Sequence, residues 1–381
     1  MTAASPLRVG LEPAYDRGRH GAWMLDLIGV FGWAATRDLA ISQAPSAVGW
    51  HRDWLARHGE TLDVRVGRVE VVEEVPASLV DGYERNAIFA ADRAPVEAGE
   101  LEAALRHLDF ARRDLLQLGT RIVAFEVAGG RLDPGDDRES DPATGTDAAR
   151  PAADVLRHLA GSEAWFVSRL DPAARFTGSD PADIEAYLLA TRTWLVDALR
   201  RLHAADPALA RTDGKGEEWT LRKLLRRAVY HSIDHLRELD RRLARSEGRI
   251  DRLTFRHDRL ADVEPLGRLL RSVGWDRRTD DMARLERAIA GSVRMIGAWD
   301  GDELVGFVRE LGDGEFNAHV SMVVVDPRWQ DLGLATRLIE RMLSGRDDVR
   351  FTLGAADGLE GYYARFGFEP DRRAMVRRRP T

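Results

Sequence analysis

The chain has 381 residues, of which 44% are hydrophobic and 31% are charged, and its formal net charge at pH 7 is -7. This length predicts two or three domains, and the negative charge argues against a general binder of nucleic acids or anionic membranes. The sequence contains no cysteine, which excludes disulfides, thiolate nucleophiles and cysteine-held metals, so any metal has to be held by His, Asp or Glu.

Signals for membrane insertion or secretion are missing from the sequence. No stretch approaches the roughly 18 consecutive apolar residues that a membrane span needs. The N-terminal run MTAASPLRVG is too polar to be the apolar core of a signal peptide. We therefore expect a cytoplasmic protein without a membrane partner.

Residues 1–85 are expected to form a small α+β module. Leu7–Leu11 and Ala22–Leu27 are predicted strands, and Gly29 and Gly32 are predicted to lie in turns that follow them. Thr36 is placed to cap a helix that follows directly.

This helix is expected to run from Arg37 toward His58, with a kink or break at Pro45. Val64–Val72 then alternates apolar and polar residues, which is typical of a half-buried strand.

The N-terminal module also carries a family resemblance. Trp23–Ala40 combines an apolar strand, a Gly-containing turn, a Thr and an acidic helix start, and in this it resembles the HicB-like antitoxin fold. The resemblance implies a regulatory or dimerisation role, which makes a homodimer possible, and we find no catalytic constellation here. The clustered side chains of the predicted helix are expected in the core or an interface rather than in a site: Trp50, His51, Trp54 and His58.

Residues 95–248 have almost no strand pattern and are expected to form an all-α four-helix bundle. Apolar residues recur at spacings of three and four in four segments: Glu97–Gly119, Ala149–Leu170, Pro181–His203 and Thr220–Ala244. Between the first two helices, Gly129–Arg150 is rich in Gly, Pro, Asp, Ser and Thr and is predicted to be a long exposed loop.

Two histidines of the last helix, His231 and His235, are four residues apart on its apolar face. Buried histidines without partners are unfavourable, and this spacing suits a shared divalent metal. A third ligand has to come from another helix, and His158 is the best candidate. The alternatives are that the histidines hydrogen-bond one another or only stabilise the bundle.

Together with Trp219-Thr-Leu-Arg-Lys-Leu-Leu, these histidines resemble the DinB-like (YfiT-type) four-helix family over about residues 97–244. The resemblance implies that His158, His231 and His235 bind zinc or nickel, and some family members transfer thiols or act on small substrates. The final His is often followed by Arg-Gly-Gln in that family. Here Leu236-Arg-Glu follows it, which leaves the surroundings of the metal ligands open.

Residues 250–381 alternate strands and helices and are expected to form an α/β domain, so the whole chain is expected to be multidomain. The predicted strands are Leu253–Arg256, Val293–Trp299, Leu304–Glu310, Val320–Val325 and Arg350–Leu353. The predicted helices are Ala261–Val273, Asp280–Ala290, Leu334–Leu343 and Leu359–Phe366. Asp300-Gly301-Asp302 is a strong hairpin signal, because Asp-Gly tolerates positive φ.

A turn that contains Gln330, Gly333 and Ala335 connects the strand ending at Val325 to a helix. The small residues let the backbone approach a ligand, and the free N–H groups of the first helical turn suit a pyrophosphate. This turn resembles the signature of the GNAT superfamily, which is Gln or Arg, two residues, Gly, one residue, then Gly or Ala. Tyr362-Tyr-Ala-Arg-Phe-Gly-Phe matches a second landmark of that family.

The GNAT resemblance implies an acyl-CoA-dependent N-acyltransferase, with acetyl-CoA as cosubstrate and a small-molecule or protein amine as acceptor. Tyr363 matches the tyrosine that protonates the departing thiolate in many members, which suits a phenol. Glu310 and His319 are guesses for the base, and Asp357 lies where many members carry a cofactor-contacting Asn. The cofactor-binding residues implied are Val323, Val324, Val325, Gln330, Asp331, Leu332, Gly333, Leu334, Ala335 and Thr336.

Two functions from different classes therefore stay open. The first is acetyl transfer from CoA to a primary amine by the GNAT-like domain. The alternative is a metal-dependent small-molecule or thiol transferase of the DinB-like type, in which the GNAT-like domain is degenerate.

Overall fold

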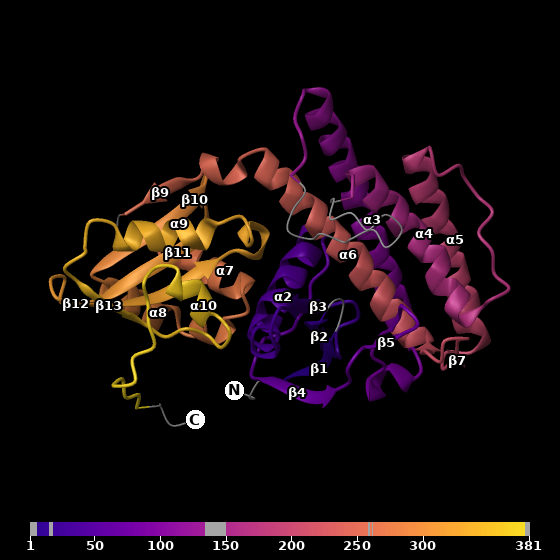
Figure 1. Ribbon diagram of the computed structural model, residues 1–381, viewed down its shortest axis with the longest axis horizontal. Helices are drawn as coiled ribbons and strands as arrows, with labels where there is room; N and C mark the ends of the chain where they lie inside the picture. Colours follow the sequence, from indigo (N-terminus) through magenta and orange to yellow (C-terminus); the bar gives the residue numbers. More distant parts are fainter. Residues whose placement is uncertain (1–5, 15–17, 134–149, 258–259, 261, 378–381) are drawn as a thin grey trace.

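The computed structural model describes residues 6–14, 18–133, 150–257, 260 and 262–377. The chain is multidomain, with a small N-terminal α+β part, a helical middle part and a C-terminal α/β part, as the sequence predicts. The α/β part lies at one end of the molecule in Figure 1, and most of the helical part lies at the other. Helix α2 (Arg37–Arg57) and helix α6 (Leu221–Ser246) lie between these ends.

A four-stranded sheet forms the N-terminal part, in the order β3-β2-β1-β4, and only β1 and β4 pair in parallel. Its strands are β1 (Leu7–Ala14), β2 (Arg19–Met24), β3 (Phe31–Ala34) and β4 (Val69–Glu74). Two short hairpin strands follow, β5 (Ser78–Val80) and β6 (Tyr83–Arg85).

The structure corrects three details of the strand prediction in this part. The second strand lies at Arg19–Met24 rather than at Ala22–Leu27, because the chain turns after Met24. Gly32, expected in a turn, lies in β3 and pairs with Ala22. The third correction concerns Val64–Val72, in which only the last residues join the sheet, since β4 begins at Val69.

Helix α2 belongs to two hydrophobic cores. Thr36 caps it by accepting a hydrogen bond from the Leu39 N–H (3.3 Å), and the helix continues through Pro45 without a break. Its first half packs Ala40, Ala44 and other small side chains on the N-terminal sheet. Its second half places Trp50, Trp54 and Leu55 in the core of the helical bundle. The two parts are therefore joined by one continuous helix.

Four long helices form the middle part: α3 (Ala98–Val127), α4 (Ala152–Leu170), α5 (Ile184–Ala205) and α6. The last two are linked by the hairpin of β7 (Ala210–Thr212) and β8 (Glu218–Thr220). The first helix is eight residues longer at its C-terminal end than the sequence predicts. Most of the predicted loop at Gly129–Arg150 lies outside the described residues.

The C-terminal part is a five-stranded sheet in the order β13-β12-β11-β10-β9, covered by helices on both faces. Its strands are β9 (Thr254–Arg256), β10 (Arg294–Asp300), β11 (Glu303–Gly312), β12 (Asn317–Val325) and β13 (Arg350–Leu353). Its helices are α7 (Glu264–Ser272), α8 (Met282–Ala290), α9 (Leu334–Leu343) and α10 (Glu360–Ala364). The predicted hairpin is present, with Gly301 at φ 58°.

Helix α2 docks closely on the C-terminal part. A methyl group built on Gly49 would lie 1.9 Å from the Ser272 carbonyl oxygen at the end of α7, so the two backbones touch. Arg52 donates to Asp276 Oδ1 at 3.1 Å, and Asp276 Oδ2 accepts from the Val66 N–H at 2.9 Å. No helix among the described residues is long and apolar enough to cross a membrane.

Candidate functional site

The cleft expected to hold a cofactor begins where β12 separates from β13. The parallel ladder between these strands covers only Asn317–Val320 of β12. Met322 then has a left-handed backbone (φ 54°), and the register of β12 against β11 shifts at the same place. The bulge ends the shared ladder. Val324 and Val325 pair with β11 on one side, and the register with β13 includes none of Val323, Val324 and Val325.

The turn that follows β12 exposes a row of backbone N–H groups. In the described part of the chain, no hydrogen bond is present from the backbone N–H groups of residues 330–336. Gly333 starts α9 with φ 86° and no side-chain cap, and a methyl group built on it would meet nothing within 4 Å. Open space and free donors at a helix N-terminus are what an anionic ligand requires.

Two side-chain contacts hold this turn in place. Gln330 Nε2 donates to the Val325 carbonyl at 3.1 Å and to Ser46 Oγ of α2 at 3.2 Å. Asp331, whose φ is 61°, has its carbonyl oxygen bonded by Arg245 of α6. The turn is therefore braced by elements from both of the other parts.

Tyr363 lies on α10, close to the start of α9. The two elements meet where Tyr362 OH lies 3.4 Å from Thr336 Oγ1. The Tyr363 side chain is buried, with its ring against those of Tyr362 and Phe368. Burial raises the pKa of the Tyr363 phenol above its usual value of 10, and the neighbouring Tyr362 adds to this. The hydroxyl group therefore keeps its proton at neutral pH.

The two residues suggested as the base that deprotonates the amine, Glu310 and His319, have different surroundings. Glu310 is fully buried and forms an ion pair with Arg346, which leaves it out of reach of an incoming acceptor. His319 is exposed on β12, with Nδ1 3.2 Å from Thr352 Oγ1. Asp357 is exposed in the segment before α10. The structure brings the turn and the tyrosine together, but it does not single out a base.

The three predicted metal ligands meet inside the helical bundle. Their candidate donor atoms all lie within 4.8 Å of one another. His231 Nε2 is 3.2 Å from His158 Nε2 and 3.2 Å from His235 Nε2. A ring nitrogen offers one proton or one lone pair, so His231 Nε2 cannot make two ordinary hydrogen bonds. Three converging imidazole nitrogens fit a shared divalent cation.

A carboxylate orients one of these ligands. His235 Nδ1 donates to Glu238 Oε2 at 2.8 Å, and Glu238 Oε1 accepts from Arg242 at 3.2 Å. An imidazole whose Nδ1 carries the proton presents the lone pair of Nε2 to a metal. Burial, and then the neighbouring His235, lowers the pKa of His158 to about 4, and burial also holds the pKa of His231 well below 6.5. These two ligands are therefore neutral at pH 7, which metal binding requires.

Sequence reasoning missed Glu238 and the arginines that surround the turn. Glu238 follows His235 by three residues, a spacing that places both on one helix face. Arg237, Arg241 and Arg245 repeat every four residues on α6, which predicts an arginine face. Nothing in the sequence places this face beside Asp331, because that contact joins residues 86 positions apart.

Fold and sites define a multidomain protein, in which a helical bundle with three converging histidines precedes an acetyltransferase-type α/β domain. The model of the DinB superfamily matches residues 48–239, which is half of the chain, and the chain belongs to that superfamily. The model of the acetyltransferase (GNAT) domain matches residues 274–378, so the C-terminal part is a GNAT domain. Both of these family predictions are confirmed. The HicB-like resemblance stays a prediction.

Three relatives are similar in sequence to about a third of this chain. A histone acetyltransferase from Glycine max is 33% identical over 33% of this chain and 59% of its own length. An uncharacterised N-acetyltransferase from Prochlorococcus marinus is 32% identical over 30% of this chain and 66% of its own length. A chloroplastic serotonin N-acetyltransferase from Oryza sativa is 35% identical over 29% of this chain and 58% of its own length. The chain thus spans less than two thirds of the length of these relatives.

A solved structure also matches about a third of this chain. An acetyltransferase of the GNAT family from Streptococcus pneumoniae is 26% identical and covers 34% of this chain and 99% of its own, with a TM-score of 0.30.

Proposed function

We propose that the protein transfers an acetyl group from acetyl-CoA to a primary amine in its GNAT domain. The observation that carries this proposal is the set of unused N–H groups at residues 330–336, next to the end of β12 that β13 leaves unpaired. The amides suit a pyrophosphate. The free side of Val323–Val325 suits the amides of a pantetheine arm, which pair as a peptide strand would.

The reaction follows from these positions. The amine nitrogen attacks the thioester carbonyl carbon, a C–N bond forms, and the C–S bond breaks. The electron pair of that bond leaves with the sulfur, and the thiolate takes the phenolic proton of Tyr363. The amine gives up one proton, and the group that accepts it stays open. Backbone N–H groups of β12 are suited to polarise the carbonyl oxygen.

Acetyl-CoA binding by the full chain tests the proposal. A ligand that binds only the folded protein, at about 100-fold its Kd, stabilises it by about 2.7 kcal/mol. We expect acetyl-CoA to raise Tm in a concentration-dependent way. A screen of small amines and of peptides with a free amine, monitored by release of the CoA thiol, should then identify the acceptor. The absence of any shift in Tm would rule out this function.

Two glycines provide a matched pair of variants. Gly333 and Gly345 both have left-handed backbones, and a methyl group on either would meet nothing within 4 Å. Gly333→Ala and Gly345→Ala therefore carry a similar backbone strain. Only Gly333 lies at the proposed pyrophosphate site, so only its variant should weaken acetyl-CoA binding. Equal affinities of the two variants would argue against this site.

A second candidate function is favoured by the three converging histidines. We propose that His158, His231 and His235 hold a zinc or nickel ion, both of which accept imidazole ligands. Such a metal would act as a Lewis acid toward a small substrate or a thiol. Glu238 would keep His235 oriented, since its carboxylate accepts the Nδ1 proton.

Metal analysis of the purified full chain tests this second function. We expect about one equivalent of metal in the unaltered protein and a loss of it in His231→Ala and His235→Ala. His257→Ala removes an exposed histidine outside the bundle and serves as the control. A metal-free protein that also fails to take up added zinc or nickel would remove this candidate.

The N-terminal part stays without a confirmed family. The three antiparallel strands followed by α2 support the HicB-like proposal for the N-terminal part. The cytoplasmic location, the possible homodimer and the absence of a nucleic-acid partner stay predictions.

A further inference from the structure

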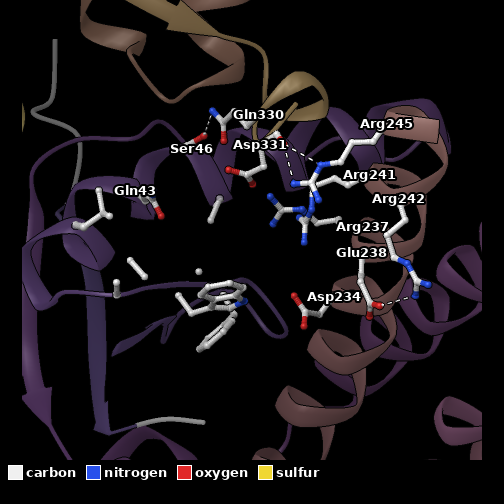
Figure 2. A pocket seen from close by; sticks show the side chains of 17 residues that line it. Gln43, Ser46, Asp234, Arg237, Glu238, Arg241, Arg242, Arg245, Gln330 and Asp331 are labelled. Carbon is white, nitrogen blue, oxygen red and sulfur yellow. Dashed lines mark hydrogen bonds and ion pairs between the residues drawn. The ribbon is translucent and has the colours of Figure 1, made fainter. Parts of the chain in front are cut away.

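A cavity of about 360 Å³ lies where the three parts of the chain meet. Its walls come from β3 and α2 of the N-terminal part, from α6 of the bundle, and from the turn of the GNAT domain. Figure 2 shows Gln330 and Asp331 at the edge of this cavity, with Arg241 and Arg245 of α6 beside Asp331. The cavity therefore adjoins the amides to which we assign the pyrophosphate.

Three arginines of α6, one helical turn apart, face this junction: Arg237, Arg241 and Arg245. Arg245 donates from Nε and from a terminal nitrogen to the Asp331 carbonyl, at 3.1 and 2.8 Å. The half-buried Arg237 has its guanidinium 4.9 Å from the Trp50 ring centre, and within the described residues it has no hydrogen bond or ion pair. Burial, and then the charge of Arg241, lowers the pKa of Arg237 to about 10. An anion between the two guanidinium groups would relieve this repulsion.

Three carboxylates also lie in the wall of the cavity, and two of them, Asp234 and Asp331, act on Arg237 in the direction opposite to Arg241. Glu238 is bonded by His235 and Arg242. Asp234 accepts a hydrogen bond from Tyr230 OH at 3.1 Å. Asp331 is the remaining carboxylate in the wall.

A second cavity, of about 640 Å³, shares two of these arginines with the first. It also contains Arg237 and Arg241 in its wall, so the two guanidinium groups stand between two cavities. Seven arginines and two aspartates line this second cavity. Several of these arginines have carboxylate partners, as Arg249 has in Asp240 and Arg328 has in Asp326. Arginine is the residue best suited to a phosphate group, because its planar guanidinium can donate two parallel hydrogen bonds.

CoA carries a third phosphate on its ribose, beside the pyrophosphate. If the pyrophosphate lies on the amides of residues 330–336, the ribose phosphate lies close to this turn. The cavity is a space lined by arginines that adjoins the turn at Gln330 and Asp331. We propose that Arg237 and Arg241 of the bundle bind the 3′-phosphate of CoA, so that the DinB-like part completes the cofactor site of the GNAT domain. This inference rests on the proposed acetyl transfer.

The test measures Kd for CoA and for 3′-dephospho-CoA by calorimetry with the full chain. A hydrogen bond to a charged group corresponds to about a 10- to 100-fold change in affinity. We expect Arg237→Gln and Arg241→Gln to weaken CoA binding by about that factor and to leave dephospho-CoA binding nearly unchanged. Arg241→Lys should restore part of the loss, since it keeps the charge.

Arg200→Gln is the matched control, because Arg200 is an exposed arginine of α5 that pairs with Glu102. It should bind both ligands as the unaltered protein does. A loss that is equal for the two ligands, or no loss at all, would overturn the assignment of the 3′-phosphate while the acetyl-transfer proposal stands. If the unaltered protein binds neither CoA nor dephospho-CoA, both proposals fail.

Discussion

Burial keeps the Tyr363 phenol protonated, which suits its proposed role as the proton donor. A phenol in water loses its proton near pH 10, and burial moves the pKa of Tyr363 further up. The sequence motif identified this residue, but the burial depends on packing against Phe368 and Tyr362. A donor that stays protonated at neutral pH is useful when a thiolate forms beside it.

Tyr363→Phe should lower kcat by about 10²- to 10⁴-fold, because general acid catalysis contributes that much. The Kd for acetyl-CoA should stay nearly unchanged, since the ring and its packing are kept. Steady-state kinetics and calorimetry check both quantities. Tyr362→Phe is the neighbouring control, and it removes a hydroxyl group that lies against Thr336. If both variants keep full activity, the departing thiolate takes its proton from elsewhere.

His51 shows the opposite effect of burial on a base. Its side chain is 3% exposed, and burial, with the charge of His107, lowers its pKa from 6.5 to about 3. Between pH 6.5 and 3 the unfolded chain binds a proton at this residue and the folded chain does not. The free energy of unfolding therefore falls as the pH falls through this window, by up to about 1.4 kcal/mol per pH unit for one group.

His51→Gln should reduce this pH dependence. Urea unfolding of the metal-free protein at pH 7, 6 and 5 measures the free energy of unfolding, and the slope below pH 6.5 should be smaller in the variant by up to about 1.4 kcal/mol per unit. The exposed His257 provides a control, since His257→Gln should leave the slope unchanged. Equal slopes in all three proteins would show that His51 does not contribute.

Among the elements, the helical bundle contains a buried charge network that links α3, α4 and α5. Glu163 Oε1 accepts from Arg112 at 2.7 Å and from Arg192 Nε at 2.8 Å, and all three side chains are almost fully buried. Arg192 also donates to Ser232 Oγ of α6 at 3.3 Å. Ser232 directly follows His231, a proposed metal ligand, so the network helps to fix the helix that carries the three-histidine cluster.

Glu163→Gln should destabilise the protein by about 3–5 kcal/mol, because it leaves two buried arginines without a counter-charge. The exposed pair of Arg200 and Glu102 gives the comparison, and Glu102→Gln should cost less than about 1 kcal/mol. Denaturant unfolding measures both changes. Similar small losses in the two variants would mean that Glu163 contributes little net stabilisation.

At the scale of the whole molecule, α2 and α6 connect the parts of the chain. Helix α2 shares its side chains between the N-terminal sheet and the bundle, and it touches α7 through Gly49. Helix α6 carries two of the three proposed metal ligands and also the arginines beside the GNAT turn. The cofactor turn is therefore positioned by residues of all three parts.

Gly49→Ala should weaken the docking of α2 on the GNAT domain. The added methyl group would lie 1.9 Å from the Ser272 carbonyl oxygen, so one backbone has to move, at a cost of about 1–3 kcal/mol. Gly99→Ala is the control in α3, where nothing lies within 4 Å, and it should stabilise by about 0.5–1 kcal/mol through helix propensity. A Tm of Gly49→Ala equal to or above that of the unaltered protein would contradict the close docking.

Local patterns were enough to predict most of the helices and strands. The helix Leu334–Leu343 and the strand Arg350–Leu353 were predicted at the bounds that the structure shows, because a Gly start and a short apolar run are local signals. β3 was missed, since its four residues contain a glycine and are stabilised by pairing with β2. Strand pairing depends on residues that are distant along the chain, and the sequence pattern does not show them.

The sequence alone was enough to identify the two families, because their motifs consist of residue types at short spacing. It also led to the site predictions, which are the turn at residues 330–336, Tyr363 and the three histidines. The convergence of the histidines, the Glu238 contact and the placement of the α6 arginines beside Asp331 required the folded chain. These contacts join helices and loops that are far apart in sequence, so their geometry depends on how the parts pack.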